Sequence, residues 1–282
     1  MTSDPLKHYT ELWKLSDPQL LAETFTSQIY TVSYQGERVV LKLLTPLGVQ
    51  DEHRGAIALH HWDGFGTVCL LRDDEQAHLL EYASGEDLIP MVQRGDDDRA
   101  TAIIADLLHQ LHMKPAATSK PLPEGLTPLT IWFRALFDKA QSDREAGQNS
   151  IYVRAARKAE EYLANPLDTR VLHGDIHHEN IRYRPQRGWL LFDPKGLIGE
   201  RTFDAANVLR NPHNMPELVE DEARMLKTAA TLARALRVET ARVLDFTYLL
   251  ACLSACWYLQ DGEDPQFDLR IARIVEPHLQ GW

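Results

Sequence analysis

The sequence predicts an α+β protein of two parts, a small antiparallel sheet followed by a larger and mainly helical region. Runs rich in β-branched and other apolar residues, separated by turn residues, occupy residues 20–44 and 67–80, and such runs are typical of strands. Apolar residues at the spacing of a helix recur through residues 100–112, 220–236 and 239–259. We therefore expect an N-terminal part over residues 1–82 and a C-terminal part over residues 83–282.

Length and composition limit the class of protein. With 282 residues, of which 44% are apolar, the chain is long enough to bury a substantial core as one large domain or two lobes. The formal net charge is −11 and there is no basic run. Nucleic acids and anionic membranes are therefore poor partners, whereas a cationic small molecule is attracted. The composition does not determine the oligomeric state, and a monomer is the default expectation.

We expect a cytoplasmic protein. The chain has no apolar stretch of transmembrane length, and its first residues lack the basic and apolar regions of a signal peptide. It contains three cysteines, and an odd number favours reduced thiols. Cys252 and Cys256 lie in an apolar helical run, so buried packing is favoured over metal binding.

The N-terminal sheet is expected to begin with three strands, at Leu20–Thr24, Gln28–Tyr34 and Arg38–Leu43, followed by a helix over Asp51–Trp62. Lys42 interrupts the apolar run of the third strand, where burying an unpaired ammonium is costly. Lys42 therefore needs anionic partners, and a lysine whose ammonium reaches the surface is the alternative.

The segment that ends at Asp193 carries most of the side chains suited to chemistry. Ile181–Tyr183 and Trp189–Phe192 are strand-like, and the Pro-Gln-Arg-Gly between them is a turn, which predicts a β-hairpin. Because both arms rise by about 3.3 Å per residue, Asn180 and Asp193 return to the same edge, with Asp175 in the loop beside them.

Three side-chain oxygen groups at one edge suit Mg²⁺, which takes oxygen ligands and is often completed by substrate phosphates. Asn180 and Asp193 are the candidate metal ligands, which leaves Asp175 to accept the proton of an incoming hydroxyl. These three residues follow one another in the order of the catalytic and metal loops of protein kinases. The sequence therefore predicts phosphoryl transfer from Mg-ATP with Asp175 as the catalytic base.

The kinase template also assigns roles in the N-terminal part. A strand lysine binds the nucleotide phosphates and pairs with a glutamate of the next helix, and Lys42 and Glu52 are the candidates. A phosphate-binding loop is expected at Phe25–Ser27, which contains no glycine. Backbone amides and the Ser27 hydroxyl would then hold the phosphates, and an ordinary turn is the alternative.

The run His173-Gly-Asp-Ile-His-His-Glu-Asn180, followed by Asp193-Pro-Lys-Gly-Leu-Ile-Gly199, resembles the aminoglycoside phosphotransferase family, in particular its streptomycin 6-phosphotransferase branch of aminoglycoside and hydroxyurea resistance kinases. The segment Glu52-His-Arg-Gly-Ala56 is similar to the same branch. The resemblance implies a protein-kinase-like fold of two lobes, ATP and Mg²⁺ as cofactors, and the 6-hydroxyl of streptomycin as acceptor. It also implies that the backbone from Glu81 to Ala83 holds adenine at a hinge between the lobes.

Carboxylates are expected to bind the cationic acceptor. Glu179 and Glu200 lie nearest the catalytic segment in the sequence, and Asp261, Glu263 and Asp264 form an acidic loop after a predicted helix. A charge cluster in a loop is otherwise a solvated surface.

Several polar residues near the catalytic segment have structural interpretations. His173 is expected to orient its loop, and His177 and His178 to support it without binding metal. Asp204 precedes a helical segment and is expected to cap it, with a contact to the catalytic loop as the alternative.

Other functions remain open. His173, Asp175, His177 and His178 are also the ligand types of a zinc hydrolase, although that function leaves Lys42 unexplained. A kinase-like module that binds nucleotide without turnover is another candidate. Within the kinase class, the acceptor could be another small alcohol or a hydroxyurea-like molecule.

Overall fold

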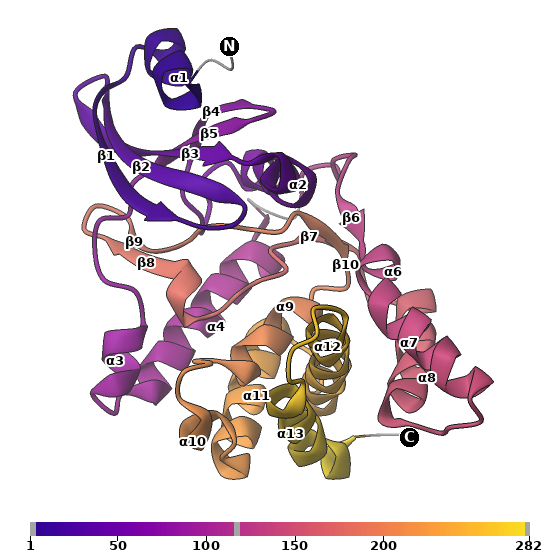
Figure 1. The fold of residues 1–282 in the computed structure, drawn as a ribbon. Helices are drawn as coiled ribbons and strands as arrows, with labels where there is room; N and C mark the ends of the chain where they lie inside the picture. The colour runs from indigo at the N-terminus through magenta and orange to yellow at the C-terminus, as the bar shows by residue number, and fades with distance from the viewer. Residues whose placement is uncertain (1–3, 116–118, 280–282) are drawn as a thin grey trace.

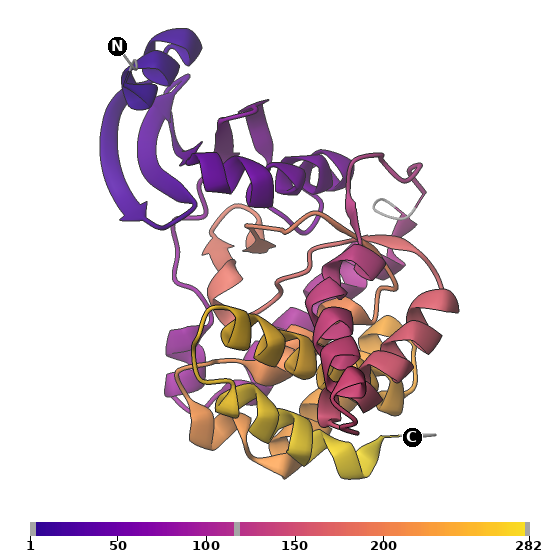
Figure 2. The same cartoon turned by 45° about the vertical axis from the view of Figure 1, so that its right-hand side comes forward.

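The computed structural model describes residues 4–115 and 119–279, without the side chains of residues 50–52. A sheet and its helices form an N-terminal lobe, and a larger helical C-terminal lobe lies below it in the view of Figure 1. The hairpin of β8 (Ile181–Arg184) and β9 (Gly188–Leu191) lies between them (Figures 1 and 2). This is the α+β architecture of two lobes that the sequence predicts.

The N-terminal sheet is antiparallel, with the strand order β1-β2-β3-β5-β4. Its strands are β1 (Ser16–Glu23), β2 (Ser27–Tyr34), β3 (Glu37–Leu44), β4 (Leu70–Asp74) and β5 (Ala77–Glu81). The three strands predicted first are confirmed within a few residues. Lys42 lies in the central strand β3, opposite Ile29 of β2 and His78 of β5. Only 7% of its surface is exposed.

Two helices pack against this sheet. The side chains of α1 (Pro5–Trp13) bury Leu41 and Leu43, and because side chains alternate along a strand, Lys42 points to the opposite face. The helix α2 (Pro46–Trp62) begins five residues before the expected start at Asp51. It starts earlier because the Thr45 hydroxyl accepts a hydrogen bond from the Gly48 amide, and a proline occupies the first turn.

Gly55 lets α2 approach the loop that follows Asp193. A β-carbon at Gly55 would lie 2.3 Å from the carbonyl oxygen of Pro194. From the loop side, a β-carbon at Gly196 would lie 2.2 Å from the Arg54 carbonyl oxygen. The two glycines therefore allow backbone contact between the N-terminal lobe and the candidate metal loop.

Replacing Gly55 by Ala is expected to destabilise the protein by a net of about 2 kcal/mol, because a β-carbon 2.3 Å from the Pro194 carbonyl oxygen places the packing cost at the upper end of about 1–3 kcal/mol. The better helix propensity of Ala would offset about 1 kcal/mol of that cost. Urea unfolding followed by circular dichroism measures the difference. A variant as stable as the parent would show that the loop and α2 are not in close contact in solution.

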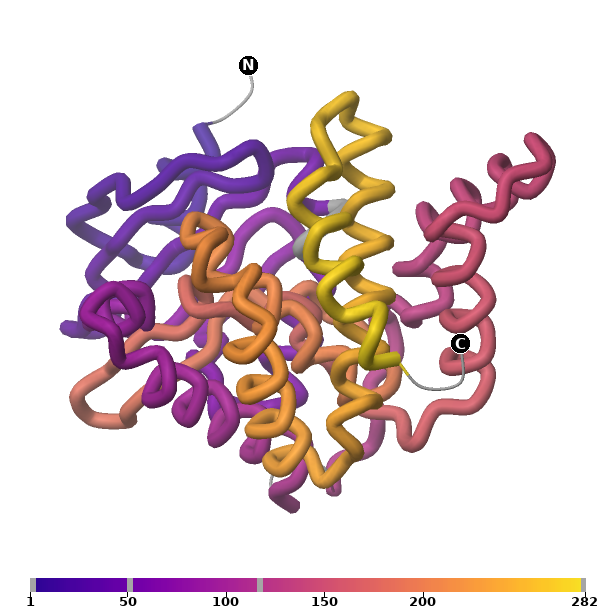
Figure 3. Tube along the Cα trace, turned by 90° about the horizontal axis from the view of Figure 1, so that it is seen from below, coloured from indigo at the N-terminus to yellow at the C-terminus, as the bar shows by residue number. Residues whose placement is uncertain are grey.

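The C-terminal lobe is built around the long helix α12 (Thr240–Gln260), which packs against α7, α8, α9, α11 and α13. Its other helices are α3 (Ile89–Gln93), α4 (Asp97–Met113), α6 (Leu129–Trp132), α7 (Arg134–Glu145), α8 (Ile151–Ala164), α9 (Phe203–Ala206), α10 (Pro216–Val219), α11 (Glu222–Leu236) and α13 (Gln266–Val275). Short strands β6 (Thr127–Pro128), β7 (Arg170–Leu172) and β10 (Leu197–Gly199) form a second sheet. Figure 3 shows α7 and α8 across α12 from the N-terminal sheet.

The helix α12 corrects one expectation from the sequence. It is long and apolar enough to cross a membrane by length and composition, although no stretch of that kind was expected. Within its most apolar window, 78% of the residues are buried inside the protein. Both Cys252 and Cys256 are among these buried residues, as predicted. The apolar character of α12 is therefore that of a core helix.

Candidate active site

The β8–β9 hairpin brings Asn180 and Asp193 to the same edge, as the sequence predicts. Ile181 pairs with Leu191 at that end of the hairpin, and the Phe192 amide donates to the Asn180 carbonyl oxygen at 3.1 Å. Asn180 ends a short 3₁₀ turn over His178–Asn180, and 9% of its surface is exposed. Asp193 follows the hairpin with a φ of +61°, a left-handed conformation that is uncommon for aspartate.

Lys42 and Asp193 meet across the two lobes. The Lys42 ammonium contacts the Asp193 carboxylate as an ion pair, although 151 residues separate them in the sequence. Burial alone would raise the pKa of Asp193, but Lys42 and Lys195 outweigh burial and lower the pKa to about 2. The Asp193 carboxylate is therefore ionised in the neutral pH range, as a metal ligand must be.

Two asparagines fix the Asp175 carboxylate. Asn180 Nδ2 donates to Asp175 Oδ2 at 3.2 Å and to the Asp175 carbonyl oxygen at 3.0 Å. Asn207 Nδ2 donates to Asp175 Oδ1 at 2.9 Å. Both carboxylate oxygens thus accept a hydrogen bond from a neutral donor, which sets the orientation of the carboxylate.

Asp204 holds the backbone of the catalytic loop. Its carboxylate accepts from the Gly174 amide at 2.7 Å and from the His173 amide at 2.9 Å, and His112 Nε2 lies 2.8 Å from it. The carboxylate is fully buried. Asp204 does not cap α9, whose N-cap residue is Thr202. The expected cap is therefore wrong, and the alternative contact with the catalytic loop is confirmed.

The sequence interpretation missed Asn207, which connects Asp175 to a buried ion pair. Arg210 donates to Asn207 Oδ1 at 3.1 Å, and its Nε donates to Asp268 at 2.9 Å. Asp268 is fully buried and Arg210 is 9% exposed. The side chains of Asp268, Arg210, Asn207 and Asp175 thus form one continuous network. No local sequence pattern could identify this network, because Asp268 lies 58 residues from Arg210.

Replacing Asn207 by Ala is expected to lower kcat by about tenfold while KM for ATP changes little, because it removes a group that orients Asp175 without touching the nucleotide. Steady-state kinetics measure both constants. Asn165→Ala, at the exposed end of α8, is the control and should behave as the parent. Parental kcat for Asn207→Ala would show that the hydrogen bond does not position the carboxylate.

A cavity of about 260 Å³ opens beside Asp175. It is lined by Trp132, Gly174, Asp175, Lys195, Asn207, Arg210, Leu250 and Trp257. The two indole rings meet edge to face with centroids 5.4 Å apart. Trp257 lies in the last turn of α12, and the Asp261 amide donates to its carbonyl oxygen at 3.0 Å. The acidic loop containing Asp261, Glu263 and Asp264 therefore follows directly from the cavity wall.

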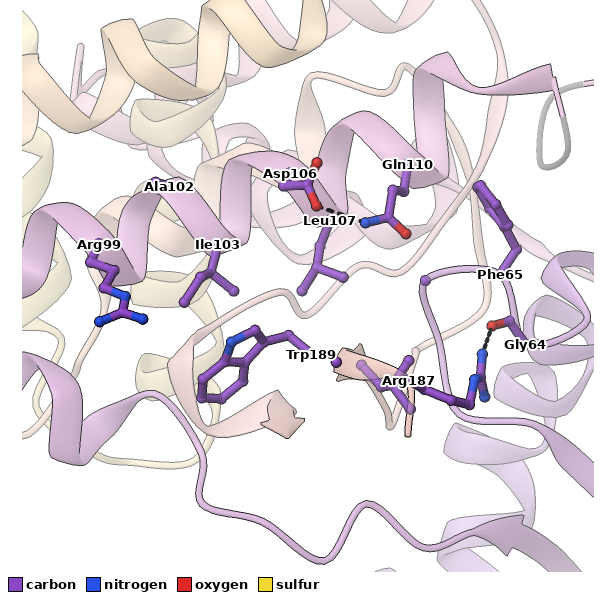
Figure 4. Close-up of a pocket in the computed structure, with 13 residues that line it drawn as sticks. Gly64, Phe65, Arg99, Ala102, Ile103, Asp106, Leu107, Gln110, Arg187 and Trp189 are labelled. Atoms are coloured by element: carbon purple, nitrogen blue, oxygen red, sulfur yellow. Dashed lines mark hydrogen bonds between the residues drawn. The ribbon is translucent and has the colours of Figure 1, made fainter. Parts of the chain in front are cut away.

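A larger cavity, of about 550 Å³, lies between α4 and the β8–β9 hairpin (Figure 4). Ile103 and Leu107 of α4 face Trp189 of the hairpin, and Arg187 donates to the Gly64 carbonyl oxygen at its edge (Figure 4). Neither Asp175 nor Asp193 lines this cavity. The smaller cavity, which contains Asp175, is therefore the better candidate for an acceptor.

Two residues predicted to bind ligands already have hydrogen-bond partners within the protein. Ser27 is buried, and its hydroxyl lies 3.2 Å from the Thr24 hydroxyl, which also accepts from the Ser27 amide at 3.0 Å. These contacts favour the ordinary-turn alternative, and a phosphate-binding role for Ser27 stays a prediction. Glu200 is buried and pairs with Arg242, so it is not a substrate carboxylate. The sequence did not show the Arg242 partner of Glu200, because 42 residues separate the two.

Glu179 and the acidic loop are accessible to a ligand, whereas the Glu81 side chain is buried. Glu179 is exposed beside His177, and the acidic loop after α12 is exposed. The carboxylate of Glu81 pairs with Arg184 and Arg187 of the hairpin, and the Glu81 amide donates to the Cys69 carbonyl oxygen at 2.9 Å. Glu52 lies in α2, but its side chain is outside the described residues.

The histidines do not converge on a metal. His173 Nε2 donates to the Phe192 carbonyl oxygen at 3.0 Å, and burial lowers the pKa of His173. His178 is fully buried, and burial lowers its pKa to about 3. Among the described residues, no group of three or more His, Cys, Asp or Glu side chains is arranged to hold a metal ion. This arrangement weighs against the zinc-hydrolase alternative.

The fold and this site define the class of protein-kinase-like phosphotransferases. A thermostable mutant of aminoglycoside phosphotransferase APH(4)-Ia, solved as a ternary complex with ADP and hygromycin B, has a TM-score of 0.64 at 14% identity and covers 98% of this chain and 99% of its own. Choline kinase LicA from Streptococcus pneumoniae has a TM-score of 0.61 at 14% identity and covers 98% and 97%. At this identity the similarity establishes the fold.

The chain belongs to the aminoglycoside/hydroxyurea antibiotic resistance kinase family, which matches residues 12–262. A streptomycin 3''-kinase from Klebsiella pneumoniae is 36% identical over 260 residues, 89% of this chain and 91% of that protein. A streptomycin 6-kinase from Streptomyces griseus is 29% identical over 80% of this chain and 73% of its own length. A hydroxyurea phosphotransferase from Kitasatospora aureofaciens is 30% identical over 86% and 69%. The chain is therefore a kinase, and binding of ATP follows from its family.

Proposed function

We propose that the protein transfers the γ-phosphate of Mg-ATP to a hydroxyl of streptomycin, with the 6-hydroxyl as the acceptor. The contact of Lys42 with Asp193, beside the Asp175 carboxylate, carries this proposal. Those residues supply a phosphate-binding cation, a metal-binding carboxylate and a general base. The names of the relatives support streptomycin as the substrate, and the Streptomyces griseus 6-kinase supports the position.

The donor set fits Mg²⁺. Asn180 turns its Nδ2 toward Asp175, so its Oδ1 points away and is suited to a hard cation, and Asp193 is ionised. In the proposed mechanism, Asn180 and Asp193 hold the metal, and Mg²⁺ neutralises phosphate charge when it is bound. Lys42 exchanges its contact with Asp193 for the nucleotide phosphates. Glu52 is the proposed counter-charge of Lys42.

Adenine is proposed to bind the backbone from Glu81 to Ala83. This segment follows β5 directly, and Ala83 is packed in an apolar cluster with Leu190. A segment that continues from a strand beside an apolar cluster suits a flat heterocycle that needs both apolar contact and hydrogen bonds. We place the boundary between the lobes here, after residue 82.

The acceptor is proposed to enter the cavity beside Asp175. Its volume of about 260 Å³ is below the range of about 300–1,000 Å³ that encloses a drug-sized ligand. One ring of streptomycin would therefore enter the cavity, and the other rings would remain at its mouth. There Glu179, Asp261, Glu263 and Asp264 would attract guanidinium or ammonium groups. Asp175 accepts the hydroxyl proton as the oxygen attacks the γ-phosphorus. We propose a cytoplasmic monomer with no nucleic-acid or membrane partner.

Incubation with Mg-ATP and separately with streptomycin, other aminoglycosides and hydroxyurea tests this function. We expect ADP and a monophosphorylated streptomycin in equal amounts, with nuclear magnetic resonance placing the phosphate on the 6-hydroxyl. Phosphate on the 3''-hydroxyl would overturn the position alone. Phosphorylation of hydroxyurea without phosphorylation of streptomycin would overturn the substrate. No turnover with any acceptor would contradict the proposed function.

A further inference from the structure

Lys195 lies between the candidate base and the candidate metal ligand. Its ammonium is 3.7 Å from Asp175 Oδ2 and 3.8 Å from Asp193 Oδ2. Both separations are those of ion pairs and exceed the length of an ordinary hydrogen bond. Lys195 also lines the cavity beside Asp175, and 27% of its side chain is exposed. A cation thus stands where the proposed acceptor and nucleotide sites meet.

The backbone around Lys195 is held on two sides. The Lys195 amide donates to the His173 carbonyl oxygen at 2.7 Å. Gly174 permits this approach, because its φ is +80° and a β-carbon there would lie 3.3 Å from the β-carbon of Lys195. On the other side, Gly196 packs against the carbonyl of Arg54 in α2. The position of Lys195 is therefore set by both the catalytic loop and the N-terminal lobe.

We infer that Lys195 is a catalytic residue that contacts the γ-phosphoryl group during transfer, an inference that rests on the proposed function. The bond between the acceptor oxygen and γ-phosphorus forms as the bond from the β–γ bridging oxygen to γ-phosphorus breaks. The hydroxyl proton goes to Asp175, and ADP leaves. The phosphoryl group therefore passes between Asp175 and Asp193, the two carboxylates that Lys195 lies beside. A cation fixed there stabilises the charge on the phosphoryl oxygens.

This role separates Lys195 from Lys42. Among the described residues, Lys42 of the N-terminal lobe forms an ion pair with Asp193, whereas Lys195 lies beside both Asp175 and Asp193. Lys42 is thus suited to the bound nucleotide, and Lys195 to the group in transit. Loss of Lys195 should slow transfer without weakening the ground-state complex, which is the signature of an interaction made in the transition state.

The test compares Lys195→Met, which removes the charge, with Lys195→Arg, which keeps it. Lys227→Met is the control, since that lysine forms an exposed pair with Asp98 on the surface. For Lys195→Met we expect kcat to fall by about 10²–10³-fold, as for loss of one transition-state donor, with KM for ATP unchanged. Lys195→Arg should recover part of the loss, and Lys227→Met should match the parent.

A binding measurement decides the role without any acceptor. Calorimetry should show that Lys195→Met binds Mg-ADP with aluminium fluoride, a mimic of the transferring group, at least about tenfold more weakly than the parent. Its affinity for Mg-AMPPNP should be unchanged. Equal affinity for both complexes in variant and parent, or equal weakening of both, would overturn the inference. If the parent phosphorylates no acceptor but this selective loss occurs, the proposed substrate fails and the role of Lys195 stands.

Discussion

Replacing Asp175 by Asn is expected to reduce kcat by about 10²- to 10⁴-fold, the usual range for loss of a general base. The variant cannot accept the hydroxyl proton. Asn180 and Asn207 both donate to the Asp175 carboxylate, so the new amide would also turn its NH₂ group toward one of these donors. Nucleotide affinity should stay close to that of the parent, because Lys42 and Asp193 are unchanged.

Single-turnover kinetics with streptomycin, together with calorimetric titration of Mg-AMPPNP, separate these two effects. Asp138→Asn, on the exposed surface of α7, is the matched control and should have parental kinetics. Parental kcat in Asp175→Asn would mean that another group takes the proton. A large loss of nucleotide affinity would assign Asp175 to the metal site instead.

Replacing Asp193 by Ala is expected to weaken Mg-nucleotide affinity by at least about 10²-fold and to reduce turnover to the background. This exceeds the effect of about 10–100-fold that is usual for residues one step removed from a metal, because Asp193 is proposed to bind the ion itself. Calorimetric titration with AMPPNP, with and without Mg²⁺, measures the change. In the parent, affinity should rise when Mg²⁺ is added, and in the variant this rise should disappear.

Asp73→Ala is the control for this titration, since Asp73 lies on β4 at the surface and pairs with the exposed His60. It should retain the effect of Mg²⁺. An Asp193→Ala protein whose nucleotide affinity still rises with Mg²⁺ would show that the metal is held elsewhere.

The sequence predicted the parts of the site that depend on local structure. The hairpin follows from strand-like runs on either side of a turn, and its geometry forces Asn180 and Asp193 together. Lys42 was identified because a charge in an apolar strand needs a partner. Its contact with Asp193 depends on the assembly of two lobes, which the order of residues in the kinase template already implied.

Most errors concern contacts that form only when separate segments of the chain fold together. Glu200 has the charge of a substrate ligand, but Arg242 lies 42 residues away and neutralises it in the core. Asn207 was overlooked because its role depends on hydrogen bonds with Asp175 and Arg210, which no sequence motif indicates. Lys195 lacked a predicted role because its contact with Asp175 depends on the fold, although the Asp-Pro-Lys sequence, where protein kinases have Asp-Phe-Gly, was a signal that could have identified it.

A crystal structure with Mg-AMPPNP and streptomycin would test the central claim most directly. We predict Mg²⁺ about 2.1 Å from oxygens of Asn180 and Asp193, Lys42 on the nucleotide phosphates, and an acceptor hydroxyl within hydrogen-bond distance of Asp175. A nucleotide bound in the cavity between α4 and the β8–β9 hairpin, with the contact between Lys42 and Asp193 intact, would contradict the account.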